Sequence, residues 1–397
     1  MNHSVIVSIS LIALLGLAAC SGSSPSGGTT GGGGTTPTNS STKTTGVVKA
    51  ICAGLNDCAL LDDGSVKCWG DDNYGELGNG TISITWEATP VTVSDIMDAV
   101  TVTAGGDHNC ALLKAGTIMC WGSNGRGQLG SSAAATCTGY AGSTFVCSQT
   151  PLQVTGITNA TVVSAGFSHT CAVLKDGTVQ CWGANDTGQL GNSTTTDSSV
   201  PMQLTGVTNA TAISAGFGHT CVVLSGGALQ CWGGNDQGEL GGGNTTISSV
   251  PVTVSNITDA VAVAAGNNYT CAILSGGTVQ CWGSNNYGAL GNGTMTNSSV
   301  PVTVSNITDA VAIAVSVGEK NGCAVLSTGS VQCWGSDNYN QLGDGTTKDS
   351  SMPVTVSGIT NAIAVAVDHE YTCALLKDGT VMCWGFNSSV PRTVAGF

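Results

Sequence analysis

Cysteines are the residues of this chain whose types and spacing most clearly could do chemistry. Fourteen of the 18 cysteines form seven pairs, each with nine intervening residues and each followed by Trp-Gly, as in GFSHTCAVLKDGTVQCWG at residues 166–183. Cysteines so arranged could form disulfides, bind a metal as thiolates, or pack as small buried hydrophobes. The pairs are Cys58 and Cys68, Cys110 and Cys120, Cys171 and Cys181, Cys221 and Cys231, Cys271 and Cys281, Cys323 and Cys333, and Cys373 and Cys383.

The turn between the cysteines distinguishes these possibilities. If residues 175–177 form a three-residue hairpin loop with Gly177 in the left-handed conformation, Leu174 faces Thr178 and Cys171 faces Cys181. The cysteines then occupy a non-hydrogen-bonded site with Cα atoms about 4.5 Å apart, at the short end of the disulfide range. Zinc sites favour two to four intervening residues, which argues against metal. The spacing predicts one cross-strand disulfide per unit, with reduced core cysteines as the alternative.

The elements that position these pairs repeat along the chain. The seven tryptophans after the pairs are spaced by 52, 61, 50, 50, 52 and 50 residues, a period typical of four-stranded propeller blades. One unit contains four short runs rich in Val, Ala and Thr, at residues 251–255, 260–266, 270–274 and 278–282. Both faces of the hairpin are mostly apolar, as expected of a sheet between two other sheets. We predict an all-β, seven-bladed β-propeller of four-stranded blades.

The unit resembles a known repeat. CWGANDTGQLGN at residues 181–192 and CWGSNNYGALGNG at residues 281–293 are similar to the regulator of chromosome condensation (alpha-tubulin suppressor-like) repeat family, whose members build seven-bladed propellers. The resemblance covers residues 47–397. After Trp384, however, the chain reads GFNSSVPRTVAGF, without the Asn-x-x-Gly-x-Leu-Gly loop, and it begins mid-unit. We therefore expect a strand near Arg392–Val394 to complete the blade that Val47–Cys52 begins, so that N- and C-terminal strands share a blade.

The N-terminal segment predicts export and anchoring. Val5 to Ala19 is an uninterrupted run of apolar or small residues, right for a signal peptide and short for a membrane span. It ends in LAAC, which resembles the lipobox of bacterial lipoproteins. This resemblance implies that residues 1–19 are a signal peptide and that Cys20 is lipidated, with palmitate among the attached acyl chains. Residues 20–46 form a Gly/Ser/Thr-rich tether reaching about 25–30 Å. We expect an oxidising bacterial envelope location, lipid-anchored at the outer membrane, periplasmic or surface-exposed.

The composition and the motifs exclude several classes of function. A net charge of -14 with 9% charged residues and no basic run gives no electrostatic footprint for nucleic acid. Gly-x-Ser-x-Gly, His-Glu-x-x-His and Walker motifs are missing from the sequence. His108, His169 and His219 recur at one repeat position, so we expect them to bond a neighbouring blade's backbone. The local run Asp368–Glu370 has no visible nucleophile beside it.

These observations favour a function without catalysis. We expect no catalytic residues, no metal and no cofactor. The protein is interpreted as a monomeric, surface-anchored module that binds a protein or a glycan. The alternatives are a hydrolase or lyase on a propeller scaffold, and an envelope structural protein with no discrete ligand, because a fold of this kind does not by itself fix function.

Departures from the repeat suggest where a ligand binds. The long spacing holds an insert at residues 131–150 with its own predicted disulfide, between Cys137 and Cys147, and two aromatics, Tyr140 and Phe145. Trp86 is the one tryptophan outside the repeat. We expect these three aromatics to bind the ligand from neighbouring loops on one face, the alternative being a tolerated, stapled insertion. Cys20 and Cys52 are left unpaired, Cys52 as a free thiol.

The anchoring hypothesis predicts the behaviour of a single variant. Cys20→Ser is expected to lose its lipid and to be either unprocessed or soluble after export, because the acyl chains are attached at that sulfur. Detergent phase partitioning of the two proteins measures this. A processed Cys20→Ser protein that still partitions with membranes contradicts the lipobox interpretation.

Overall fold

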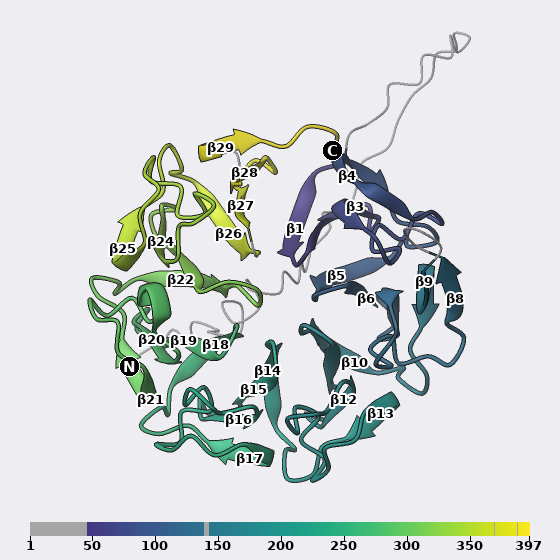
Figure 1. The fold of residues 1–397 in the computed structure, drawn as a ribbon, viewed down its shortest axis with the longest axis horizontal. Coiled ribbons are helices and arrows are strands. Elements are labelled where there is room, and N and C mark those ends of the chain that lie inside the picture. Colours follow the sequence, from purple (N-terminus) through teal and green to yellow (C-terminus); the bar gives the residue numbers. More distant parts are fainter. Residues whose placement is uncertain (1–45, 139–142, 369, 387) are drawn as a thin grey trace, which may run out of the picture.

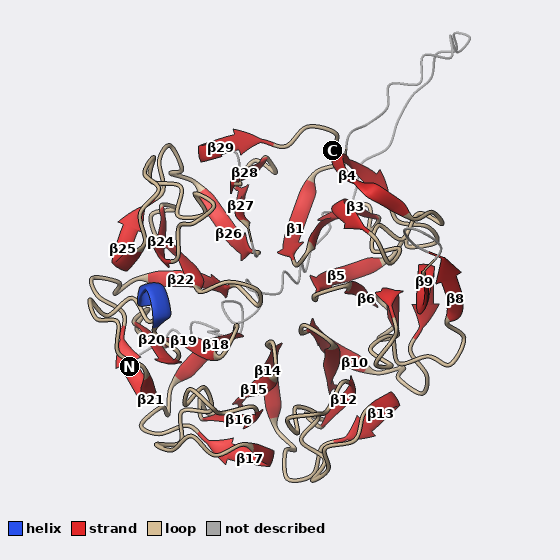
Figure 2. Cartoon of the chain, viewed as in Figure 1, coloured by secondary structure: helices blue, strands red, loops and turns tan. Residues whose placement is uncertain are grey.

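The propeller occupies the described part of the chain. The computed structural model describes residues 46–138, 143–368, 370–386 and 388–397. Seven antiparallel sheets stand around a central axis like blades, as Figures 1 and 2 show. The predicted seven-bladed all-β fold is confirmed. The predicted signal peptide, Cys20, nearly all of the tether and Tyr140 lie outside the described residues. Among the described residues, no helix is long and apolar enough to cross a membrane.

Each blade runs from an inner strand at the axis to an outer strand at the rim. The strands of the first three blades are β1 (Val48–Ala53), β2 (Asn56–Leu61), β3 (Val66–Asp72), β4 (Ser83–Thr92); β5 (Ala99–Ala104), β6 (His108–Leu113), β7 (Ile118–Ser123), β8 (Ala135–Thr138), β9 (Thr144–Gln153); and β10 (Ala160–Ala165), β11 (His169–Leu174), β12 (Val179–Gly183), β13 (Ser198–Gln203).

The other four blades follow the same order. Their elements are β14 (Ala210–Ala215), β15 (His219–Leu224), β16 (Leu229–Gly233), β17 (Ser248–Thr253); β18 (Ala260–Ala265), β19 (Tyr269–Leu274), β20 (Val279–Gly283), the 3₁₀ turn η3 (Asn286–Gly288), β21 (Ser298–Thr303); β22 (Ala310–Val315), β23 (Asn321–Leu326), β24 (Val331–Gly335), β25 (Ser350–Thr355); and β26 (Ala362–Val367), β27 (Tyr371–Leu376), β28 (Val381–Gly385), β29 (Ser388–Thr393).

The hairpin that carries each cysteine pair has the predicted register. Cys171 lies opposite Cys181, Leu174 N–H donates to the Thr178 carbonyl at 2.8 Å, and Gly177 has φ 78°. The same register places the two cysteines of every other blade opposite each other on the two middle strands.

All seven cysteine pairs of the blades are disulfides in the structure, as the spacing predicts. Their Cα separations of 4.0–4.1 Å are slightly shorter than the expected 4.5 Å of a non-hydrogen-bonded pair. An eighth disulfide, between Cys137 and Cys147, joins β8 to β9. The blade disulfides are Cys58 to Cys68, Cys110 to Cys120, Cys171 to Cys181, Cys221 to Cys231, Cys271 to Cys281, Cys323 to Cys333, and Cys373 to Cys383.

Ring closure differs from the prediction. β1 belongs to the sheet β1–β4, and β29 belongs to β26–β29, so the two terminal strands do not share a blade. Arg392 pairs with Cys383 of its own blade, while β4 completes the first blade. Every blade is thus continuous in sequence, and the ring closes by packing of side chains between the last and first blades. The insert also adds a fifth strand, β8, to the second blade.

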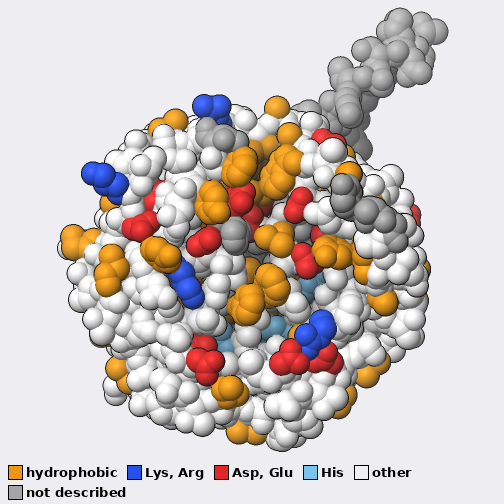
Figure 3. Space-filling view, in the orientation of Figure 1, with side chains coloured by type: hydrophobic (Ala, Val, Ile, Leu, Met, Phe, Trp, Pro, Cys, Tyr) orange, Lys and Arg blue, Asp and Glu red, His pale blue; other side chains and the backbone are white. Residues whose placement is uncertain are grey.

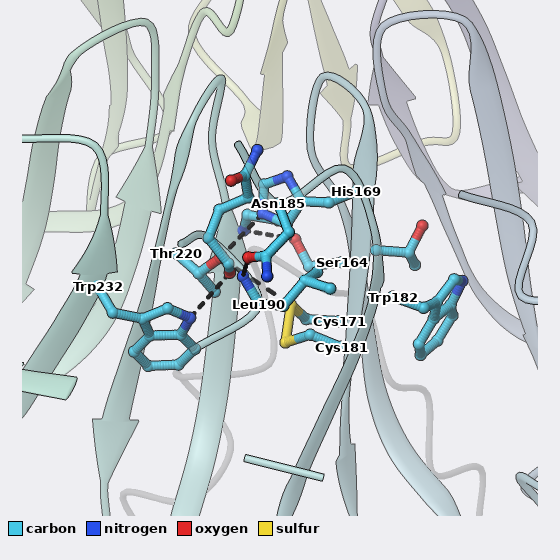
Figure 4. The surroundings of a disulfide bond; sticks show 12 residues. Ser164, His169, Cys171, Cys181, Trp182, Asn185, Leu190, Thr220 and Trp232 are labelled. Atoms are coloured by element: carbon cyan, nitrogen blue, oxygen red, sulfur yellow. Dashed lines mark hydrogen bonds between the residues drawn. A yellow bond between two sulfur atoms is a disulfide. The ribbon is translucent and has the colours of Figure 1, made fainter. Parts of the chain in front are cut away.

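One turn joins each of the first six blades to the next, and Figure 4 shows it between the third and fourth blades. In the third blade, the Leu190 N–H donates to Asn185 Oδ1 at 2.9 Å, which holds the turn closed. The Gln189 carbonyl then accepts from Trp232 Nε1 at 2.8 Å and from the Thr220 hydroxyl at 2.9 Å, both in the fourth blade. Leu190 is fully buried in the seam. We call this arrangement the seam clamp.

The seam clamp recurs wherever its turn is present. The same indole-to-carbonyl bond joins Trp121 to Glu76, Trp182 to Gln128, Trp282 to Glu239, Trp334 to Ala289 and Trp384 to Gln341, at 2.7–2.9 Å. These bonds satisfy buried polar groups that would otherwise be costly. The Cys-hairpin-Cys-Trp unit therefore repeats because each of these tryptophans fastens its blade to the turn of the preceding one.

The repeated histidines are structural, as predicted, but their partner differs. His169 Nε2 lies 2.9 Å from the Thr220 hydroxyl of the next blade, a side chain rather than backbone. His108 and His219 make the same contact to Thr170 and Thr270. Burial lowers the pKa of His169 to about 4, so the ring is neutral at pH 7. A neutral ring can share a hydrogen with a hydroxyl without carrying buried charge.

The disulfide assignment predicts the number of reactive thiols. Sixteen cysteines are paired, and if Cys20 is lipidated, as the sequence predicts, Cys52 is the one remaining thiol. Desolvation raises its pKa, which lowers the reactivity of this partly buried thiol in the folded protein, so the alkylation is done on unfolded protein. Intact-mass measurement after alkylation in denaturant, without reductant, is expected to show a single adduct. Three or more adducts contradict the pairing.

Glu76 makes the stability of the first seam clamp sensitive to pH. Burial is the main cause that raises the pKa of Glu76 to about 8. The protonated form of Glu76 therefore stabilises the folded protein fully at pH values below the pKa of Glu76 in the unfolded chain. This stabilisation is lost as pH rises through 8. In three other turns glutamine stands here, and Gln128 Oε1 accepts from Arg126 N–H as Glu76 Oε2 accepts from Tyr74 N–H. We expect Glu76→Gln to raise Tm by about 2 °C or more at about pH 9, with almost no change at about pH 4.

Thermal unfolding at the two pH values measures this, with Gln128→Glu as the reciprocal variant, which should lose stability mainly at high pH. If the Tm difference between Glu76→Gln and wild type is the same at both pH values, the assignment of a buried, protonated Glu76 is contradicted.

Candidate functional site

The seam between the last and first blades lacks its clamp. In the sixth blade Gly335 pairs with Ser350, whereas in the seventh Gly385 pairs with Ser388, so the connection is twelve residues shorter. No Gly-x-Leu-Gly turn remains there to cover Trp69. Among the described residues, the hydrophobic cluster at this seam has eight buried members, against eleven to fourteen at the others, and six more of its hydrophobic residues are only partly buried. The hydrophobic side chains of the seventh seam are therefore the least completely buried.

Aromatic side chains partly replace the missing turn. A Cβ on Gly183 would lie 3.2 Å from Gln128 Cα of the preceding turn, but a Cβ on Gly70 would lie 3.5 Å from Cη2 of Trp86. Trp86 comes from β4 and packs edge-on against Tyr371 of β27, with centroids 5.7 Å apart. Phe397 packs edge-on against Trp69 at 5.4 Å. The tip of Trp86 thus stands near the place that a turn backbone occupies in the other seams.

The replacement leaves a cavity of ≈ 780 Å³, which we call the seam pocket. Its volume is within the range of ligand sites in proteins. Trp86 and Phe386 are 50% and 56% exposed. Figure 3 shows hydrophobic side chains gathered over the seam between β26–β29 and β1–β4, with acidic side chains around the central opening. Four segments line the seam pocket. They are Trp69; Trp86, Ala88 and Thr89; Glu370 and Tyr371; and Cys383–Phe386 with Ser388 and Arg392–Gly396.

Polar groups of the seam pocket lie at its rim and behind its base. Glu370 and Arg392 are both among the lining residues. Behind Trp69 and Tyr371 lies Asp57, which is 1% exposed. Burial raises the pKa of Asp57 well above its usual value, and interactions with the Tyr371 hydroxyl and the Trp69 indole partly offset this. Asp57 Oδ1 makes no hydrogen bond of standard geometry.

Asp57 occupies a repeat position with a defined role elsewhere. It precedes Cys58 as Thr220 precedes Cys221, and the Thr220 hydroxyl donates to the turn carbonyl of the preceding blade. In the second blade Asn109 is there, and its Nδ2 donates to the Glu76 carbonyl at 2.8 Å. The first blade has an acid at this position and no turn carbonyl to meet it.

The described residues form no metal site at the seam pocket. Asp57, Cys373 and Cys383 have possible ligand atoms within 4.8 Å of one another, the one such group among the described residues. The two sulfurs are joined in a disulfide, so they present no thiolates to a metal. In the run 368–370, Asp368 is buried and Glu370 lines the seam pocket, while His369 lies outside the described residues.

The three predicted ligand-binding aromatics do not converge. Trp86 lines the seam pocket and contacts Tyr371 of the seventh blade. Phe145 instead packs on Tyr74, with centroids 4.6 Å apart, and Tyr140 lies outside the described residues. The insert does adjoin the turn of the first blade, since Gly80 N–H donates to the Gln149 carbonyl at 2.9 Å. Trp86 and Phe145 therefore belong to different seams.

Sequence reasoning missed most of the seam pocket. Trp69 and Tyr371 occupy repeat positions, and the repeat made them look purely structural. The signal that could have found them is the missing turn after Trp384, because each turn covers the tryptophan of the next blade. Following the ring round, the uncovered tryptophan is Trp69.

Comparison with known families agrees with the architecture. The family description "RCC1-like domain" matches residues 102–391, and "Regulator of chromosome condensation (RCC1) repeat" matches residues 63–112. The first match covers more than half of the 397 residues. The chain belongs to the RCC1-like propeller family, as its resemblance to the repeat predicted. Propellers of this family typically serve as protein-binding modules.

Individual relatives share parts of this chain or its fold. The probable E3 ubiquitin-protein ligase HERC6 of Homo sapiens is 35% identical over 155 residues, which is 38% of this chain and 14% of the ligase. The ultraviolet-B receptor UVR8 of Arabidopsis thaliana is 32% identical over 154 residues, 38% of this chain and 32% of the receptor. The chain thus spans less than a third of these relatives.

Two solved structures share the fold. Prp20p from Saccharomyces cerevisiae has a TM-score of 0.69 at 20% identity, covering 82% of this chain and 82% of its own. Human WBSCR16 has a TM-score of 0.73 at 19% identity, covering 83% and 87%. At this identity the similarity establishes the fold alone.

Proposed function

We propose that this protein is a non-catalytic, disulfide-stabilised binding module whose protein partner enters the seam pocket. The observation that carries the proposal is the contrast between seams. Six seams are filled by a turn, and the seventh leaves ≈ 780 Å³ lined by aromatic side chains. A propeller needs its blades packed against one another, so an unfilled seam is a loss of stability unless something binds there.

The side chains of the seam pocket suit a protein anchor. Trp86 is half-exposed and Phe386 more so, and aromatic side chains supply large contact areas at low entropy cost. Glu370 and Arg392, which also line the seam pocket, carry opposite charges, and such charges orient a partner more than they increase its affinity. Prp20p, a protein of the same fold, has binding properties to Gsp1p and histones, which supports a protein as the partner class.

A glycan is the second candidate, because the seam pocket is lined by the exposed ring of Trp86 and also by a carboxylate and a guanidinium group, which are groups that bond hydroxyls. The enzyme alternatives find less support. Asp57 is buried behind Tyr371 and Trp69, so its carboxyl does not reach a substrate in the seam pocket as it stands.

The proposed setting is the bacterial envelope. The apolar run before Cys20 and the LAAC motif support a lipid anchor on a long tether. The eight disulfides support an oxidising compartment. In this proposal the domain is a monomer held clear of the membrane, and its acidic charge disfavours nucleic-acid partners.

The proposal predicts which aromatic controls partner capture. The mature chain carrying Cys20→Ser serves as bait, with Trp86→Ala as the test and Tyr287→Ala as the control, because Tyr287 is 46% exposed but lies in the fifth blade. Trp86→Ala is expected to weaken binding of the captured partner by about 30-fold, since a true anchor contributes about 2 kcal/mol. Phe145→Ala tests the insert separately.

Circular dichroism checks the fold of each variant, and protease treatment of the captured material distinguishes a protein from a glycan. Equal affinity of folded Trp86→Ala and wild type contradicts the seam pocket as the binding site. Loss in Phe145→Ala alone moves the site to the insert.

A further inference from the structure

The seventh seam retains the indole and the glycine of the receiving half of the seam clamp, while Asp57 stands in place of the hydroxyl. In the fourth blade this half consists of Trp232, which donates its indole N–H, and Gly233, whose missing side chain admits the turn. Trp69 and Gly70 stand at the matching positions of the first blade, and Gly70 has φ 109° as Gly233 has φ 107°. Trp69 is 4% exposed, so it is held in place without a turn above it.

The leucines of the turns that fill the other seams are all buried. The residue after each leucine is glycine, and the reason is steric: a Cβ on Gly191 would lie 2.7 Å from Trp232 Nε1. The leucines are Leu77, Leu129, Leu190, Leu240, Leu290 and Leu342, which are 0–2% exposed.

The position two residues before each leucine is also constrained. A Cβ on Gly188 would lie 2.7 Å from Ser249 Cα on the next blade's outer strand. Five turns have glycine here, and the sixth has Asn340, which keeps the left-handed conformation with φ 66°. Gly-x-Leu-Gly is therefore the sequence that best meets both constraints.

The outer strand of the first blade is ready for the same approach. Gly233 pairs with Ser248, next to Ser249, and Gly70 pairs with Glu87, next to Ala88. Ala88 is exposed and lines the seam pocket. A small side chain therefore stands where the first glycine of a turn would arrive.

We propose that the partner element recognised by the seam pocket is a Gly-x-Leu-Gly turn supplied by another protein. The turn buries its leucine beside Trp69, and the carbonyl of residue x accepts from Trp69 Nε1 in place of Asp57, with which this indole interacts in the free protein. The tip of Trp86 leaves Gly70 and packs on the outside of the turn. This inference rests on the proposed function, because it names the partner of the same site.

The turn has to come from a different chain. The six turns of this chain are already buried in their own seams, so a folded second copy has none to offer. The turn also holds its own shape, because its side chains form hydrogen bonds with its backbone. Asn185 Oδ1 accepts from Leu190 N–H and Asn185 Nδ2 donates to the carbonyls of Thr194 and Thr196.

A cyclic peptide of residues 183–198 is the direct probe. Gly183 and Ser198 are cross-strand partners, so linking the two ends holds the turn in its native shape. We expect saturable binding to the mature chain by titration calorimetry. The same peptide with Leu190→Ala should bind at least about 30-fold more weakly, since a buried leucine truncated to alanine typically costs about 2 kcal/mol or more.

Two protein variants locate the peptide. Asp57→Asn places the donor of Asn109 at the seventh seam, and one added hydrogen bond to the turn carbonyl should tighten binding by about 3- to 10-fold. In the second variant residues 184–197 replace 386–387, so the seam is filled in cis. That variant should lose peptide binding and gain in Tm. If the grafted chain does not fold, Ala88→Arg blocks the seam pocket instead, with the exposed Thr195→Arg as control.

The outcomes separate this inference from the proposed function. Binding of the cyclic peptide that disappears in the filled or blocked seam supports the Gly-x-Leu-Gly turn. Peptide binding that persists there, or that ignores Leu190→Ala, overturns it. No peptide binding to wild type also overturns it, while capture of a partner that still depends on Trp86 leaves the proposed function standing. Capture that is unaffected by filling the seam overturns both.

Discussion

A single carbonyl group in each of six seams holds neighbouring blades of this propeller together. In the third blade it belongs to Gln189, and it accepts hydrogen bonds from an indole and a hydroxyl of the fourth blade. The carbonyl can do this because Asn185 closes the turn and Gly191 lets the turn approach the ring. The disulfide behind it fixes the hairpin that carries the tryptophan. The tryptophan, the glycines and the cysteines of the repeat therefore serve one contact, and changing any of them alters the seam.

The same constraint explains why the seventh seam differs. With no carbonyl to receive them, the donors of the first blade would be left unpaired in an apolar seam, which is costly. The chain has Asp57 in place of the usual donor, it has the tip of Trp86 near the place of a turn, and it has Phe397 packed against Trp69. These changes keep the ring closed but fill the space incompletely. A gap of this kind in an otherwise regular ring is where a partner can bind without competing with the fold.

The six regular seams and the candidate binding site occupy different parts of this molecule. Six seams are closed internally by the carbonyl of a turn, and three of them also hold a buried histidine whose pKa is lowered by burial. The seventh seam has two half-exposed aromatics, Trp86 and Phe386, and two lining residues of opposite charge, Glu370 and Arg392. The insert stapled by Cys137 and Cys147 extends the second blade by a strand and contacts the turn of the first. It lies apart from the seam pocket, so the two irregular features of the chain are independent candidates for recognition.

The sequence by itself determined the repeat, the number of blades, the hairpin register and the pairs of cysteines, because all of these depend on residues close together in the chain. A turn of Lys-Asp-Gly fixes which residues face each other eight or ten positions apart. Tertiary structure alone decided how the ring closes and where the candidate site lies. Neither the sequence of the turn nor that of the tryptophan strand indicates that the turn of one blade accepts the hydrogen bond from the tryptophan of the next. Trp69 and Tyr371 are 302 residues apart in the numbering, and they become one pocket only because the last blade is packed against the first.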